Sequence, residues 1–241
     1  MKKRSGFFAL ATSAVLLVIA AVPAQASHSR NNDHWARTAN PFTLKLGDNV
    51  TSAWDSYLST ASSDWTASSV LNTTIVAGSA GNVKRCSPPA GRVEVCNSKY
   101  GFNGWLGIAG ITLSGGHITS GYVKLNDSYF NTSSYNTPAW RLFVTCQEIG
   151  HTLGLDHTDE NFGNPNLGTC MDYTNDPDGP PSNEHPNAHD YDQLASIYAH
   201  LDGNTTVGSA TPSGPGRPSR SRSSNVDAHG NGTVTWTLWV E

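Results

Sequence analysis

The residues best suited to chemistry lie close together, between positions 146 and 157. Gln147 and His151 are four apart, so on a helix they lie one turn apart on the same face, with Glu148 beside them. Gly154 can take the left-handed conformation that ends a helix and turns the chain back, which would bring His157 toward His151. Two converging imidazoles can hold a metal ion, and a neighbouring carboxylate can take a proton from metal-activated water. The spacing therefore predicts a metal-dependent hydrolytic site.

The same stretch resembles the metzincin clan of zinc endopeptidases (matrixin- and astacin-like), whose motif reads H-E-x-x-H-x-x-G-x-x-H. Glu148, His151, Gly154 and His157 match this motif, whereas glutamine 147 stands at the first ligand position. The resemblance implies a zinc-dependent endopeptidase that hydrolyses peptide bonds. In such an enzyme Glu148 would be the general base and acid, and His151 and His157 would be metal ligands.

A second element of the resemblance follows the motif. The run Gly-Thr-Cys-Met-Asp-Tyr at 168–173 is similar to the methionine turn that lies beneath the metal in metzincins. Its Met-x-Tyr form, Met171 and Tyr173, is similar to the astacin and serralysin branches, in which that tyrosine ligates zinc or hydrogen-bonds the transition-state oxyanion. The resemblance therefore implies that Tyr173 is an oxyanion stabiliser or an extra ligand.

Glutamine at position 147 is the one departure from the motif. An amide oxygen is a rarer and weaker zinc ligand than an imidazole nitrogen. Three hypotheses follow: Gln147 ligates through its oxygen with help from Tyr173, or it hydrogen-bonds a metal-bound water, or the site is metal-free. In the third case the protein would be a pseudo-peptidase whose old substrate groove binds a polypeptide. A replacement ligand would have to come from another histidine, with His117, His185 and His189 as candidates.

The four cysteines fall into two near pairs. In an oxidising compartment an even number of cysteines predicts disulfides, here with three possible pairings. We favour Cys86 with Cys96 and Cys146 with Cys170, because the second bridge would join the motif helix to the methionine turn. A thiolate metal site is disfavoured because no C-x-x-C spacing is present. A cysteine nucleophile at Cys146 would leave the rest of the metzincin motif without a function.

The N-terminus has the three parts of a secretory signal peptide: basic residues at 2–4, an apolar stretch over 7–22 and Ala-Gln-Ala at 24–26. Cleavage after Ala26 would remove three of the 15 basic residues and none of the 19 acidic ones, moving the formal net charge from −4 to −7. This charge argues against nucleic acid as the main partner. We expect a secreted, monomeric protein that is not in the membrane after cleavage and acts on an extended polypeptide substrate.

The pattern of elements predicts an α+β fold, which by the resemblance would be a metzincin-like twisted mixed sheet with an active-site helix and a C-terminal helix. Helical spacing of apolar residues favours helices over 49–65 and 189–200. Thr137 followed by Pro138 predicts the start of the motif helix, which would end at Leu153. Apolar runs favour strands over 70–77, 92–96, 105–113, 116–125 and 234–240.

Composition divides the chain into four parts. A signal peptide over 1–26 precedes a peptidase-like domain over 27–202. A linker rich in Gly, Ser, Thr and Pro follows over 203–224, and a strand-like tail over 225–241 ends the chain. The tail is too short to fold alone, and its alternating pattern is typical of a strand added to the domain.

Two further expectations concern ligands. In metzincins the strand before the active helix is a sheet edge that pairs with extended substrate, and the resemblance implies 117–125 for that strand. The loop before the last helix carries several acidic residues, the kind of oxygen donors that Ca²⁺ takes, but no recognised cage spacing. We expect this loop to be solvated, with Ca²⁺ as an alternative cofactor beside Zn²⁺.

Overall fold

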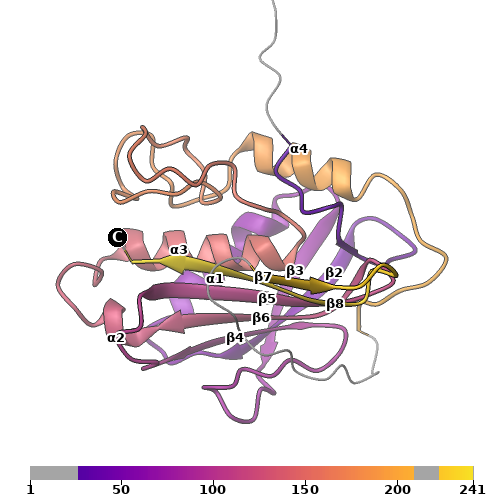
Figure 1. Cartoon of the computed structure of the whole chain (residues 1–241), viewed down its shortest axis with the longest axis horizontal. Helices are drawn as coiled ribbons and strands as arrows, with labels where there is room; N and C mark the ends of the chain where they lie inside the picture. The colour runs from indigo at the N-terminus through magenta and orange to yellow at the C-terminus, as the bar shows by residue number, and fades with distance from the viewer. Residues whose placement is uncertain (1–26, 209–222, 241) are drawn as a thin grey trace, which may run out of the picture.

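The computed structural model of this protein describes residues 27–208 and 223–240. They form an α+β fold, as predicted, in which helices α1 and α3 pack side by side on one face of a mixed sheet (Figure 1). The predicted signal peptide over 1–26 and most of the predicted linker over 203–224 lie outside the described residues. Among the described residues, no helix has the length and apolar character needed to cross a membrane.

The sheet has the strand order β3-β2-β4-β6-β5-β8-β7, and a short eighth strand, β1, pairs with the beginning of β6. Neighbours run parallel from β3 to β6, whereas the β6–β5, β5–β8 and β8–β7 pairs are antiparallel. The strands are β1 His34–Trp35, β2 Phe42–Asn49, β3 Leu71–Ala77, β4 Val93–Ser98, β5 Trp105–Ser114, β6 His117–Asn126, β7 Ser223–Val226 and β8 Gly232–Trp239.

Capping side chains and a glycine turn set several of the helix ends. The helices are α1 Asp55–Thr66, α2 Asp127–Phe130, α3 Pro138–Thr152 and α4 Ala188–Ile197. The Thr137 side chain caps α3 by accepting a hydrogen bond from the Trp140 backbone N–H at 3.2 Å. Gly154, with φ +98°, turns the chain back just after α3. Asn187 and Asp190 form a capping box at the start of α4.

The core lies between the sheet and helices α1 and α3. Leu58, Ala61 and Trp65 are buried on the face of α1 that meets α3 and β3. The Trp65 indole donates a hydrogen bond to the Cys146 backbone oxygen at 3.1 Å, which fixes α1 against the motif helix. Large buried aromatic side chains of this kind supply much of the apolar burial that stabilises a domain.

Several expected boundaries differ from the structure. The helix expected over 49–65 begins only at Asp55, because Asn49 still belongs to β2 and Trp54 N donates to Thr51 O in a turn. The helix expected over 189–200 ends at Ile197. The strand over 117–125 is not a sheet edge, since β6 pairs with β4 on one side and β5 on the other. Strand β5 lies on the outer side of β6, and β8 pairs with it.

Both favoured disulfides are present. Cys86, in the loop before β4, joins Cys96 within β4, and Cys146 in α3 joins Cys170. No cysteine of the chain is free. The second bridge ties the motif helix to the segment that carries the predicted methionine turn.

Candidate metal centre

The two histidines of the motif face each other through their Nε2 atoms, which are 2.9 Å apart. His151 lies in the last turn of α3, and the turn at Gly154 returns the chain so that His157 meets it edge to face. The Nδ1 atom of His151 lies 3.0 Å from the backbone oxygen of Leu155, and the Nδ1 atom of His157 lies 3.0 Å from a carboxylate oxygen of Glu160. The contacts of the two Nδ1 atoms therefore fix the orientation of both rings.

The hydrogen bonds behind the rings determine which nitrogen carries a proton. Carbonyl and carboxylate oxygens only accept, so both Nδ1 atoms must donate. In neutral rings both Nε2 atoms then carry lone pairs, and these face each other at 2.9 Å. Such contact is repulsive unless a positive charge lies there, either a proton or a metal ion. Metal-binding histidines commonly show this arrangement, with the outer nitrogen bonded to a carbonyl or carboxylate.

Gln147 and His151 are four residues apart on α3, so their side chains leave the helix on the same face. Its Nε2 donates to two backbone oxygens, Cys170 O at 2.9 Å and Asp172 O at 3.2 Å, which fixes the amide. Its Oε1 is buried and has no hydrogen-bond partner among the described residues. A buried acceptor without a partner is costly. Zn²⁺ suits the donor set of two imidazole nitrogens and one amide oxygen, although the oxygen is the weakest of the three.

Glu148 is fully buried and packs closely on Gly107 of β5, where a side chain would collide with its carboxylate. Burial raises the pKa of Glu148 well above its ordinary value, and the Ala109 backbone N–H opposes this with a smaller effect. Neither carboxylate oxygen has a hydrogen-bond partner of normal geometry among the described residues. Exclusion of water from this site therefore favours the protonated form of Glu148 over the carboxylate.

The predicted methionine turn lies under α3. The Met171 sulfur packs against Gly150 of the helix, where no larger residue would fit. Tyr173 contacts the His157 ring with centroids 4.4 Å apart. Burial raises the pKa of the Tyr173 hydroxyl, and the Glu160 and Glu148 carboxylates raise it further, so this hydroxyl remains a hydrogen-bond donor. The turn therefore brings a donor beside the histidine pair.

Strand β8 covers the site. Trp236 stacks on His151 with the ring planes 7° apart and the centroids 4.9 Å apart, and its indole donates to Asp156 Oδ1 at 3.0 Å. The Tyr173 hydroxyl donates to the backbone oxygen of Thr237 at 3.4 Å. His151 has no exposed surface and only 3% of the His157 side chain is exposed. Sequence reasoning gave Trp236 no function, although the alternating pattern around it already predicted a strand.

The other candidate ligands lie elsewhere. His185 pairs with Asp64 at 2.8 Å, His189 faces His28 at 3.1 Å, and His117 approaches Asp202 at 3.2 Å. None of the three has a contact with the motif histidines among the described interactions. Within residues 27–208 and 223–240, the acidic loop after the methionine turn gathers no group of three carboxylate or histidine ligands.

A scan against models of known protein families returns no match for this chain, and a search of curated proteins returns no relative.

Proposed function

We propose that this chain is a secreted, metzincin-like zinc endopeptidase, held in a closed form by its own C-terminal strand. The observation that carries the proposal is the pair of Nε2 atoms 2.9 Å apart, because both outer nitrogens are bonded to acceptors and the inner ones need a cation between them. The buried Gln147 Oε1 supplies a third donor on the same helical face. Two disulfides are compatible with an oxidising, extracellular compartment.

Each residue then has a defined part in peptide hydrolysis. His151, His157 and Gln147 would hold the ion. When bound, Zn²⁺ would polarise a peptide carbonyl and lower the pKa of a bound water. Glu148 would accept the proton of the attacking water and return it to the leaving amine. The Tyr173 hydroxyl would donate a hydrogen bond to the oxyanion.

The C-terminal strand indicates how a polypeptide would bind. Strand β8 pairs antiparallel with β5 from Gly232 to Trp239, and its Trp236 side chain stacks on His151. The Tyr173 hydroxyl already donates to a peptide carbonyl of this strand, that of Thr237. An extended substrate added to β5 would make the same kind of backbone pairing. Strand β8 thus has the position and direction that we expect for substrate.

The closed arrangement must open before catalysis. No substrate can reach His151 while Trp236 is stacked on it, and burial of Glu148 disfavours the carboxylate form that a base requires. Displacing β8 would give substrate access to His151 and would favour the carboxylate form of Glu148. It would free the pairing edge of β5 and admit water to the Glu148 side chain.

A second candidate function is a pseudo-peptidase that only binds polypeptides along β5. It is favoured by the amide at position 147, which is a weaker ligand than histidine and is already fixed by two backbone oxygens. In that case the protein would bind a polypeptide along β5 without hydrolysing it. The two candidates differ in whether Glu148 matters, since binding alone needs no proton transfer.

The test is cleavage of a denatured polypeptide by the full chain, with and without a chelator. Wild type and Trp236→Ala are compared with the same proteins carrying Glu148→Gln, and Asp192→Asn on the exposed surface of α4 is the control. We expect chelator-sensitive cleavage that falls about 10²–10⁴-fold in Glu148→Gln and is unchanged in Asp192→Asn. If neither wild type nor Trp236→Ala cleaves the substrate with zinc in excess, the pseudo-peptidase is the better account.

A further inference from the structure

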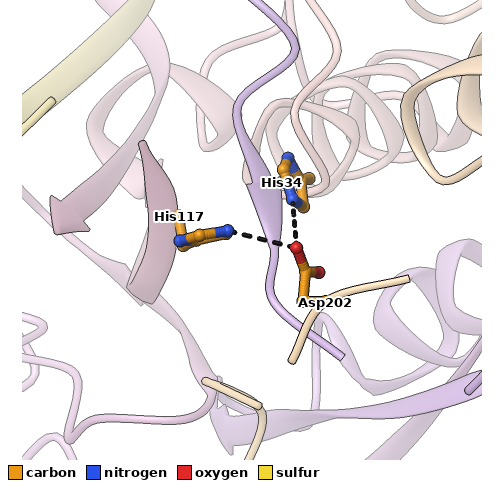
Figure 2. Close-up of side chains that lie close together, drawn as sticks. All are labelled: His34, His117 and Asp202. Atoms are coloured by element: carbon orange, nitrogen blue, oxygen red, sulfur yellow. Dashed lines mark hydrogen bonds and ion pairs between the residues drawn. The ribbon is translucent and has the colours of Figure 1, made fainter. Parts of the chain in front are cut away.

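A second histidine cluster lies at the start of β1 and β6. His34 and His117 are register partners in this short parallel pair, so their side chains stand next to each other on one side of the sheet. The segment after α4 brings His200 and Asp202 to the same place. Figure 2 shows the two strand imidazoles directed at one oxygen of the Asp202 carboxylate.

Three potential ligand atoms, one each from His34, His117 and Asp202, lie within 4.8 Å of one another, and His200 Nε2 lies beside the atoms of His34 and Asp202. The Nε2 atoms of His117, His34 and His200 lie 3.2, 3.4 and 3.6 Å from Asp202 Oδ1. His34 Nε2 and His200 Nε2 are 3.2 Å apart. A zinc ion with four tetrahedral ligands at about 2.0–2.1 Å separates those ligands by about 3.3 Å. The four spacings given above are close to that edge length, and they exceed the usual hydrogen-bond length of about 2.9 Å.

The position of the ring hydrogen on His34 also indicates a cation at the centre of this cluster. Its Nδ1 lies 2.7 Å from the backbone oxygen of Asn32, which can only accept, so Nδ1 carries the hydrogen. The Nε2 of a neutral His34 ring then presents a lone pair to the anionic Asp202 oxygen and to His200. Like the pair on α3, this contact needs a positive charge at its centre.

The carboxylate is held in position from its other side. Arg37 donates to Asp202 Oδ2 from its backbone N at 3.1 Å and from its guanidinium at 2.9 Å. These bonds occupy Oδ2 and leave Oδ1 directed at the histidines. Bonds of this kind, behind the atoms that bind the metal, orient the ligands of many metal sites.

We propose that His34, His117 and Asp202, with the neighbouring His200 as fourth ligand, form a second metal site that binds Zn²⁺. Three imidazoles and one carboxylate are a zinc donor set, whereas Ca²⁺ and Mg²⁺ prefer oxygen ligands alone. His34 and Asp202 are largely buried, and His200, with 53% of its side chain exposed, closes the site from the solvent side. The proposal does not depend on peptidase activity.

Another group of similar composition shows why convergence matters. His28 uses Nδ1 to face His189 at 3.1 Å and Nε2 to face Asp190 at 3.1 Å. These two nitrogens are on different edges of one ring, so the three residues form a chain and do not surround a point. The cluster around Asp202 is the only group of three or more His, Cys, Asp or Glu ligands that converges among the described residues.

A metal here would brace the end of the motif helix. Trp35, next to His34, donates from its indole to Thr152 O at 2.9 Å, and the Tyr198 hydroxyl donates to Leu153 O at 3.0 Å. Tyr198 lies between α4 and the segment that carries His200. The ion would therefore join β1, β6 and the chain after α4, the three segments that surround the C-terminal end of α3.

Zinc binding by the full chain tests the site. The measurement is made in a His157→Ala background, which removes the centre on α3 so that the two sites cannot be confused. His117→Ala and the milder His200→Ala are compared with His229→Ala, an exposed histidine in the β7–β8 turn. Replacing an outer partner of a ligand weakens metal binding about 10–100-fold, so losing His117 itself should weaken it by about 100-fold or more. His229→Ala should bind like the background.

Two further readouts make the outcome decisive. Bound Co²⁺ should give the intense visible bands of a tetrahedral ion, and zinc should raise the melting temperature of the background and of His229→Ala but not of His117→Ala. Absence of zinc binding in the His157→Ala background, or equal affinity in His117→Ala and His229→Ala, would overturn the proposal. The residues would then form a hydrogen-bonded cluster around a protonated histidine. If wild type binds no more zinc than the His157→Ala background, and that background still binds one ion through His117, the proposed function is contradicted and this site stands.

Discussion

Two histidine clusters in this chain have similar inner geometry and different surroundings. The Nε2 atoms of His151 and His157 are 2.9 Å apart, and those of His34 and His200 are 3.2 Å apart. In both clusters a backbone oxygen fixes the proton of one ring on its outer nitrogen. Ligand chemistry alone therefore does not separate a catalytic site from a structural one.

The neighbours of each cluster make the difference. The pair on α3 has Glu148 on the same helix and the Tyr173 ring against His157, groups that can move or hold a proton, and Trp236 of β8 covers it. The cluster at β1 has Arg37 behind its carboxylate, and 53% of its His200 side chain is exposed. The first arrangement suits a reaction, and the second suits a permanent cross-link between segments.

The disulfides provide the largest test of this contrast. Removing the Cys146–Cys170 bridge with two alanines should lower the free energy of unfolding by about 3 kcal/mol, because a loop of 24 residues is released in the unfolded chain. It should also weaken zinc binding on α3, since the bridge holds the backbone oxygens that fix Gln147. Denaturant titration and zinc competition measure the two effects.

The matched control is the Cys86–Cys96 bridge, which closes a shorter loop away from both histidine clusters. Its removal should cost a similar free energy and leave both zinc affinities unchanged. Equal loss of zinc in the two double variants would mean that the disulfides act only through global stability.

The next test weakens the cover that Trp236 of strand β8 forms over His151. Trp236→Ala should increase the rate at which a chelator removes zinc from α3 by roughly 10-fold or more, because a stacked aromatic pair and a hydrogen bond each contribute about 1 kcal/mol to closure. Trp239→Ala, at the end of the same strand, should have little effect, and Trp236→Phe should restore slow release. The rate at the β1 cluster should not change. A Trp236→Ala rate equal to wild type would show that β8 does not gate the site.

Gln147→His should produce the smallest of these changes. An imidazole in place of the amide oxygen is expected to tighten zinc binding on α3 by about 10-fold, with no change at the His34 cluster. Competition with a coloured chelator measures both sites in one titration. Identical affinities before and after substitution would mean that another group is the third ligand.

Much of the α3 site was predictable because it is local. The spacing from Gln147 to His157, the cap at Thr137 and the turn at Gly154 act over neighbouring residues, and the sequence contains all of that information. The two disulfides were predictable for a related reason, since their cysteines fall in near pairs. The α+β class also followed from local patterns.

What the sequence did not predict depends on pairing between distant segments. Nothing local indicates that Trp236 stacks on His151, or that His34 and Asp202 meet, because strand register and loop docking bring them together. The edge strand was placed wrongly at 117–125 because strand order in a sheet does not follow chain order. Strand β2 was missed because its polar residues Lys45, Asp48 and Asn49 weaken the apolar pattern.

Diffraction from crystals grown with zinc, recorded at the zinc absorption edge, tests the central claim most directly. We expect an anomalous peak about 2.1 Å from the Nε2 atoms of His151 and His157, with Gln147 Oε1 as a further ligand. We also expect a second peak among His34, His117, His200 and Asp202. Absence of a peak between His151 and His157 at saturating zinc would contradict the metal centre on α3 and, with it, the proposed peptidase.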